Sequence, residues 1–280
     1  MAGNGMVKGK MKTMSNKVKR RLCTAVFILS IIMFICFALS FAEAQKRYRH
    51  SDGDLQTALE IRGETAPFIS GEVKAEMDEA SLRAAEHEAG EIRQKGYNRL
   101  KEENADVVGW ISIENTKVDY PVMQTAEEPD YYYRRGFDGK YSSYGMIYMD
   151  ASCTLEPPCP NYILYGHHMK NGAMFASLEK YGSEGYYLEH PVIDFELQGK
   201  LGTYEIVGAV RLPADKLNNE FAAVLAAGTQ EDYETLIQYV KEHSAYDTGI
   251  TAEWPTQLLT LTTCEYTQKD GRFLVVARAS

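Results

Sequence analysis

The sequence predicts a mainly β protein whose strands close, or nearly close, into a barrel preceded by helices. Three observations support this class. Short runs rich in β-branched and aromatic residues recur from residue 107 to the C-terminus, with turn residues between them. A stretch rich in Ala, Glu, Lys and Arg precedes these runs and favours helix. Near the N-terminus, an apolar run is long enough for a membrane-spanning helix.

The apolar run, residues 22–42, contains 21 positions without a charge. A helix rises about 1.5 Å per residue, so this length just spans a hydrocarbon core of ~30 Å. Seven basic residues precede the run, and the positive-inside rule keeps residues 1–21 cytoplasmic and sends the C-terminal body across the membrane. A cleaved signal peptide is the alternative, because Ala42-Glu43-Ala44 fits a cleavage pattern, but the run is longer than a usual signal segment.

Charge is distributed unevenly along the chain. Residues 1–49 hold ten Lys or Arg and one Glu, a net charge of +9, and the whole chain carries −9, so residues 50–280 carry −18. Binding of nucleic acid needs clustered basic side chains that neutralise phosphates. The acidic body therefore excludes nucleic acid as an expected partner. A calcium site is compatible with this charge, but no loop shows regularly spaced oxygen ligands.

Residues 54–103 predict a helical stalk and lead-in helices, with sparse apolar positions. From residue 107 the pattern changes to alternating apolar and polar residues, broken at Asn115 and Pro121. Further strands are expected in GMIYMD, NYILYGH, PVIDFEL, GTYEIVGAVRL, QLLTLTTC and RFLVVARA.

An insertion between Ala214 and Pro255 interrupts these strands. It contains a predicted helix with one apolar stripe, formed by Tyr233, Leu236, Ile237 and Val240. We expect this stripe to pack on the barrel; a partner-binding face is the alternative.

The five cysteines fall into three groups. Cys23 and Cys36 lie in the apolar run, where a thiol is most often a small apolar side chain. Cys153 and Cys159 bracket the loop CTLEPPC, for which a disulfide, a redox-sensitive lid and an ordinary insertion all stay open. Cys264 is left over, and its surroundings decide whether it is a bystander or a reactive thiol.

Cys264 ends the segment TLTTC, at the end of an expected strand. Arg272 follows after TQKDG, in which Lys269-Asp270-Gly271 predicts a turn, so a hairpin brings Arg272 beside Cys264. A neighbouring cation stabilises a thiolate, or the oxyanion that forms when a thiolate attacks a carbonyl. Arginine suits the second task because its charge is permanent. Arg278 competes for this role but lies further from the turn.

His167 and His168 follow the strand NYILYG. Imidazole accepts a thiol proton and protonates a leaving amine near neutral pH. Neighbours on extended backbone point to opposite faces, so only one of these histidines can face Cys264, and the other is expected to pack or to lie at the surface. A zinc site is the alternative use of Cys and His, but neither CxxC nor HExxH spacing occurs.

Together these three motifs resemble those of sortases. TLTTC is similar to the TLxTC signature, YGHHM followed by MF is similar to the histidine segment, and the arginine of GRFLVVA falls at the third catalytic position. VGWISI, YPVMQ, residues 130–145 and the helix-bearing insertion resemble class B in particular. The resemblance covers about residues 104–279, and CTLEPPC departs from the class pattern.

The resemblance implies a closed eight-stranded β-barrel, with residues 43–103 as helical stalk and lead-in and residues 104–280 as catalytic domain. It also implies a cysteine transpeptidase that cleaves a C-terminal sorting signal after Thr and forms a thioacyl enzyme. Cys264 then corresponds to the nucleophile, His167 to the acid/base and Arg272 to the oxyanion-stabilising cation. Thr262 and Thr263 would line the site for the substrate threonine.

The implied partners are a sorting-signal peptide, an amine acceptor such as a peptidoglycan precursor or a pilin lysine, and the membrane through the N-terminal helix. No cofactor and no metal are expected. The expected location is the cell membrane of a Gram-positive-type envelope, with one span, a cytoplasmic N-terminus and an extracellular catalytic domain. Two other functions stay open: an extracellular cysteine endopeptidase that uses water, and an inactive membrane-tethered binding module.

Overall fold

The structure, a computed structural model, describes residues 16–63, 77–213, 219–265 and 271–280. The chain separates into an N-terminal unit that ends at Arg47 and a larger unit that begins at Tyr48. Helix α1 (Asn16–Arg62) contributes residues to both units.

In the N-terminal unit, α1 is one continuous helix with an apolar surface. Its large apolar side chains between Val26 and Phe41 are exposed. By length and composition this helix could cross a membrane. Three of the basic residues expected before the span, Lys8, Lys10 and Lys12, lie outside the described residues.

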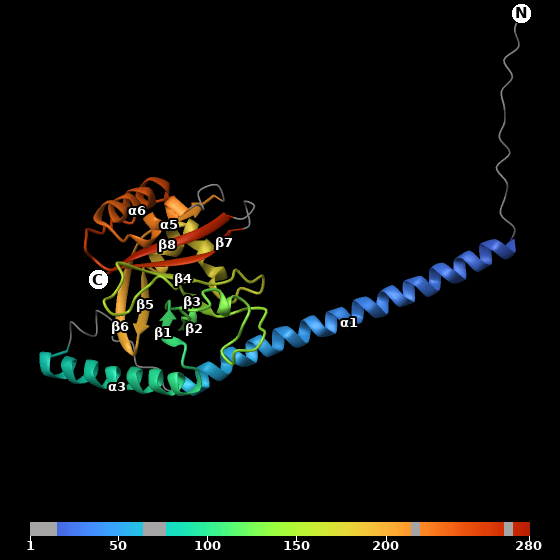
Figure 1. The fold of residues 1–280 in the computed structure, drawn as a ribbon, viewed down its shortest axis with the longest axis horizontal. Coiled ribbons are helices and arrows are strands. Elements are labelled where there is room, and N and C mark those ends of the chain that lie inside the picture. The colour runs from blue at the N-terminus through green and yellow to red at the C-terminus, as the bar shows by residue number, and fades with distance from the viewer. Residues whose placement is uncertain (1–15, 64–76, 214–218, 266–270) are drawn as a thin grey trace, which may run out of the picture. The chain divides into compact units, whose positions relative to one another are not determined.

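In the larger unit, eight strands form a closed barrel in the order β1-β2-β3-β4-β7-β8-β6-β5 (Figure 1). The pairs β2–β3 and β4–β7 are parallel, and the other pairs are antiparallel. The predicted eight-stranded barrel is confirmed. The strands are β1 (Val107–Ser112), β2 (Asp119–Met123), β3 (Ile147–Met149), β4 (Asn161–Tyr165), β5 (Val192–Leu197), β6 (Lys200–Leu212), β7 (Leu258–Glu265) and β8 (Gly271–Ala279).

Helices surround the barrel, and the predicted insertion helix packs on it. The stripe Tyr233, Leu236, Ile237 and Val240 of α6 is buried in the main core, as predicted. The helices of the larger unit, besides the end of α1, are α3 (Glu79–Glu103), α4 (Glu184–Glu189), α5 (Asn219–Ala226) and α6 (Gln230–His243), with the 3-10 helices η1 (Tyr131–Tyr133) and η2 (Phe175–Gly182).

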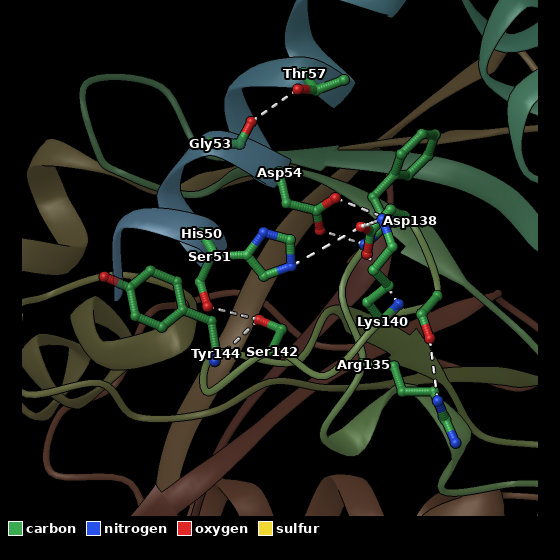
Figure 2. A network of polar contacts seen from close by, with 12 residues as sticks. His50, Ser51, Gly53, Asp54, Thr57, Arg135, Asp138, Lys140, Ser142 and Tyr144 are labelled. Carbon is green, nitrogen blue, oxygen red and sulfur yellow. Dashed lines mark hydrogen bonds and ion pairs between the residues drawn. The ribbon is translucent and has the colours of Figure 1, made fainter. Parts of the chain in front are cut away.

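The last turns of α1 dock on the segment between η1 and β3 through polar contacts (Figure 2). The buried carboxylate of Asp54 accepts hydrogen bonds from the backbone N–H groups of Phe137 and Asp138, at 3.1 Å for Asp138. The hydroxyl of Ser51 bonds that of Ser142 at 2.9 Å. A side chain at Gly136 would clash with Asp54, because a Cβ there would lie 2.1 Å from Oδ2. These contacts fix the segment that follows η1, and η1 reaches the site described next.

Candidate active site

Cys264 and Arg272 are direct partners on neighbouring antiparallel strands. Cys264 on β7 pairs with Arg272 on β8, and two residues earlier Thr262 pairs with Leu274. Side chains of directly opposite residues share one face, with Cβ atoms about 5 Å apart. The structure therefore brings the predicted nucleophile beside the predicted cation. The turn expected to join them, residues 266–270, lies outside the described residues.

His167 reaches the same place from a strand far away in sequence. Strand β4 runs parallel to β7, and Tyr165 pairs with Thr262. The pairing continues past the end of β4, because the Gly166 N–H donates to the carbonyl of Thr262 at 3.1 Å. His167 follows Tyr165 by two residues, as Cys264 follows Thr262, so the end of the β4–β7 pairing leads to both residues. A Cβ at Gly166 would lie 2.5 Å from Ile147 and 2.6 Å from Phe175, so the residue before His167 has no room for a side chain.

The ring of His167 is held by η1. Its Nε2 lies 2.7 Å from the carbonyl oxygen of Tyr133, and the two aromatic rings are 4.5 Å apart. A carbonyl oxygen only accepts, so Nε2 carries a hydrogen and Nδ1 is the basic atom of the neutral ring. Burial lowers the pKa of His167, and the nearby charge of Arg134 lowers it further, while the bond to Tyr133 acts in the opposite direction. The neutral, proton-accepting form is thereby favoured near neutral pH.

His168 contacts the main chain of Cys264. Its Nδ1 lies 3.3 Å from the carbonyl oxygen of Cys264 and 3.2 Å from Oε1 of Glu179, on η2. The hydrogen bond is directed at the carbonyl, and the buried Oε1 of Glu179, which has no hydrogen-bond partner among the described residues, lies beside the same nitrogen. The sequence predicted that the second histidine packs or lies at the surface. The structure gives it a more specific position, against the backbone of the predicted nucleophile.

The positive charge of Arg272 also acts on a residue of β3, Tyr148. Nη1 of Arg272 donates to the carbonyl of Gly271 at 3.1 Å. Burial raises the pKa of Tyr148, and the positive charge of Arg272 acts on that phenol in the opposite direction. Tyr148 lies beside Tyr165 of β4, with ring centroids 5.4 Å apart. Aromatic side chains of β3 and β4 therefore border the site.

The competing arginine, Arg278, occupies the other end of β8. It pairs with Leu258 in the sheet, and its Nη2 lies 2.6 Å from Oε2 of Glu205. Arg278 lies six residues after Arg272 on β8. Its bond to the Glu205 carboxylate makes it part of a structural ion pair of the barrel. Its position does not suit it for a role beside Cys264.

The two predicted substrate-site threonines have different surroundings. Thr263 is buried, and its hydroxyl donates to the carbonyl of Gly166 at 2.8 Å, which ties β7 to the segment that carries His167. Thr262 lies two residues before Cys264 and is also buried, and among the described residues nothing hydrogen-bonds its Oγ1. A buried hydroxyl without a partner costs about 1–3 kcal/mol, so Thr262 has an unsatisfied group that a ligand could bind. Binding of substrate by either residue stays a prediction.

The other cysteines of the larger unit do not join this site. Cys153 and Cys159 both lie within reach of the carbonyl of Asn161, at the start of β4, whereas His167 follows its end. Within the described ranges, no three His, Cys, Asp or Glu residues lie close enough together to hold a metal ion.

Four residues of the site lie outside the predicted motifs or roles: Tyr133, Tyr148, His168 and Glu179. The parallel pairing of β4 with β7 and the fold of η1 and η2 bring them together. Only His168 carried a signal in the sequence, since it follows His167 directly. Tyr133 lies in residues 130–145, which resemble class B but gave no role to this tyrosine, and Tyr148 and Glu179 come from segments without a motif.

Comparisons with known proteins agree with this geometry. The family model of the sortase domain matches residues 111–280. Sortase B of Listeria monocytogenes is 32% identical over 191 residues, which cover 66% of this chain and 74% of that protein. Sortase B of Staphylococcus aureus is 27% identical over 261 residues, which cover 92% of this chain and 97% of that protein.

Solved structures show the same fold. A Staphylococcus aureus sortase B–substrate complex superposes with a TM-score of 0.60 at 27% identity, covering 67% of this chain and 85% of that one. Sortase B of Clostridium perfringens gives a TM-score of 0.60 at 30% identity, covering 65% of this chain and 98% of that one. With the closed barrel and the Cys264–Arg272 pair, these matches show that the chain belongs to the sortase family of cysteine transpeptidases, in class B.

Proposed function

We propose that this sortase cleaves a C-terminal sorting signal of exported proteins after Thr and transfers the protein to an amine of the cell wall or of a pilin lysine. The observation that carries the proposal is the pairing of Cys264 with Arg272 across β7 and β8, with His167 two residues beyond the end of β4, the parallel neighbour of β7. A related sortase B has been solved as a substrate complex, which supports a peptide substrate for this chain.

In the first step, His167 takes the proton of the Cys264 thiol, and the thiolate attacks the threonyl carbonyl. The negative charge that develops on the carbonyl oxygen is stabilised by Arg272. His167 then protonates the leaving amine, and the C–N bond breaks to give a thioester on Cys264. Thr262 and Thr263 are proposed to border the substrate threonine.

In the second step, an acceptor amine attacks the thioester. His167 accepts the proton of the attacking amine, and the C–S bond breaks to return the thiol of Cys264. The product is an amide that links the exported protein to the acceptor. Protein groups alone supply this chemistry, and the proposed mechanism requires no metal or cofactor.

We further propose that residues 22–42 anchor the enzyme in the membrane as a single span. Residues 1–21 then lie in the cytoplasm, and the stalk and lead-in at 43–103 precede an extracellular catalytic domain at 104–280. The exposed apolar side chains of α1 support this arrangement. Protease treatment of intact cells tests it, because only the C-terminal body should be digested.

Intact-mass spectrometry of the full chain in detergent tests the chemistry. The protein is incubated with a pool of threonine-containing sorting peptides, with and without an added amine, beside the Cys264→Ala variant. An adduct on the unmodified enzyme alone, discharged by amine into a new peptide product, is the expected result. Discharge only to water would make the protein an endopeptidase. Failure to form an adduct, with a Cys264 that also resists alkylation, would make it a binding module.

A further inference from the structure

The loop between β3 and β4 brings two thiols together. The Sγ atoms of Cys153 and Cys159 lie 3.5 Å and 3.2 Å from one shared acceptor, the carbonyl oxygen of Asn161. Two sulfur atoms that approach one oxygen lie no further apart than the sum of these two distances. Because both Sγ atoms approach one oxygen, rotation about the two Cα–Cβ bonds can bring them within bonding reach of each other.

The backbone on both sides of the thiols is braced by the barrel. The N–H of Cys159 donates to the carbonyl of Thr154 at 3.0 Å, which closes the loop on itself. The side-chain amide of Gln124 donates to the carbonyl of Cys153 at 2.8 Å, and that of Gln257 donates to the carbonyl of Cys159 at 2.7 Å. The proximity of the thiols is therefore built into the fold.

The two thiols differ in access to solvent. Cys153 is 6% exposed, whereas Cys159 is partly exposed beside the exposed residues Pro157 and Pro158. The neighbouring thiol lowers the pKa of Cys159 and, together with burial, raises the pKa of Cys153. A reagent from solvent therefore meets Cys159 first, and Cys159 is also the thiol that ionises first.

We propose that Cys153 and Cys159 form an intramolecular disulfide by exchange with an extracytoplasmic disulfide donor, with Cys159 as the attacking thiol and Cys153 as the resolving thiol. Cys159 loses its proton, and its thiolate attacks one sulfur of the donor disulfide and breaks the S–S bond; the donor's other sulfur leaves as a thiolate and takes up that proton. Cys153 then loses its proton and attacks the sulfur of Cys159, expelling the donor's remaining sulfur as a thiol. The cysteine pair is oxidised, and the donor disulfide is reduced to two thiols.

The modification has a direct consequence for the predicted nucleophile. Residues 48–280 contain three cysteines, and a bond between Cys153 and Cys159 leaves Cys264 as the only thiol among them. The bond would also fix the start of β4, the strand that leads to His167. The disulfide proposal does not depend on the proposed transpeptidation.

Peptide mapping of the full chain tests the proposal. The protein, purified in detergent, is reduced, treated with oxidised glutathione, alkylated and cleaved with trypsin. The fragment between Lys140 and Lys170 contains Cys153, Cys159 and no other cysteine, whereas Cys264 lies in the fragment that follows Lys241. The expected fragment 141–170 has lost two hydrogen atoms, carries no alkyl group and regains both thiols on reduction. Two alkylated cysteines in this fragment would overturn the proposal.

Matched single variants test the order of attack. In Cys153→Ser, glutathione should accumulate as a mixed disulfide on Cys159, because the resolving thiol is absent. In Cys159→Ser, the buried Cys153 should stay unmodified until the protein is denatured. The reverse pattern, or equal modification of both folded variants, would overturn the assigned order. Circular dichroism confirms that each variant is folded. Peptide mapping of the unmodified chain tests disulfide formation without either variant.

Discussion

Nδ1 of His168 lies 3.3 Å from the carbonyl oxygen of Cys264, so a side chain next to the predicted base holds the backbone of the predicted nucleophile. The carbonyl can only accept, which places the hydrogen on Nδ1. Oε1 of Glu179 lies 3.2 Å from the same nitrogen, and a second acceptor there also favours a hydrogen on Nδ1. His168 is thus a positioning residue, and its contribution can be separated from that of His167.

Replacement of His168 should slow acylation of Cys264 with little change in KM. Loss of one such hydrogen bond costs about 1 kcal/mol, and we expect about a fivefold to tenfold lower kcat in His168→Ala. His168→Asn keeps a donor near the position of Nδ1 and should recover most of the rate, whereas His168→Gln places its amide further out and should not. Steady-state kinetics with a sorting peptide measure this, and equal losses in the Asn and Ala variants would contradict the role.

Replacement of Arg134 should shift the pH profile. The charge of Arg134 helps to keep the pKa of His167 below its ordinary value. In Arg134→Gln this pKa should rise, so protonation removes the base at a higher pH and the acid limb of kcat/KM moves upward. Arg135→Gln is the matched control, because Arg135 stacks on Tyr131 instead. A limb that moves equally in both variants, or in neither, would refute the electrostatic explanation.

Arg272→Lys should lower kcat by about a hundredfold or more, because loss of an oxyanion donor has an effect of that size and lysine lacks the rigid donor geometry of arginine. Arg278→Lys provides the comparison on the same strand. Arg278 pairs with Glu205, so its replacement should affect the thermal midpoint more than the rate. Single-turnover acylation rates distinguish the two arginines, and a larger rate loss at Arg278 would reverse their assignment.

Thr262→Val should separate activity from stability. The hydroxyl of Thr262 is buried and has no hydrogen-bond partner among the described residues, so an apolar side chain of the same shape should leave stability nearly unchanged. If the hydroxyl binds substrate, kcat/KM should fall by about tenfold. Thr260→Val is the control, since its hydroxyl bonds Asn161 at 3.0 Å and its loss should cost stability. Full activity in Thr262→Val would remove Thr262 from the substrate site.

Asp54→Ala should destabilise the larger unit. The carboxylate accepts from two backbone N–H groups, and leaving buried donors unsatisfied costs about 1–3 kcal/mol. Gln56→Ala, on the exposed side of α1, should stay close to the parent. Urea unfolding followed by tryptophan fluorescence gives the free energy of unfolding. A difference below the error between the two variants would show that the docking contacts of Figure 2 contribute little.

Short segments of the sequence predicted more features of this structure than relationships between distant segments did. The hairpin that joins Cys264 to Arg272 spans a few residues and carries turn signals, so the pairing of its two strands and the placement of Arg272 beside Cys264 followed from the sequence. The apolar stripe of α6 had a helical period and is buried as expected. The resemblance to sortases added the strand number and the choice of His167 over His168.

Contacts between distant segments could not be predicted in this way. Gly166 and Thr263 are 97 positions apart, and no periodic pattern in the sequence predicts the hydrogen bond between them. Glu179 approaches His168 only because η2 packs against β7, and Asp54 meets Phe137 only because α1 ends on the segment after η1. Such partners are selected by tertiary packing, which a single sequence encodes without a local signal.

The parallel junction between β4 and β7 also sets an order of assembly. Contacts across a hairpin close a short loop, whereas the junction that delivers His167 closes a loop of almost a hundred residues and forms later, because its entropic cost is greater. Until that junction forms, the thiol has its cation but lacks its base. A partly folded chain in which this junction has not formed therefore lacks the complete site, and we expect reactivity only when folding is complete.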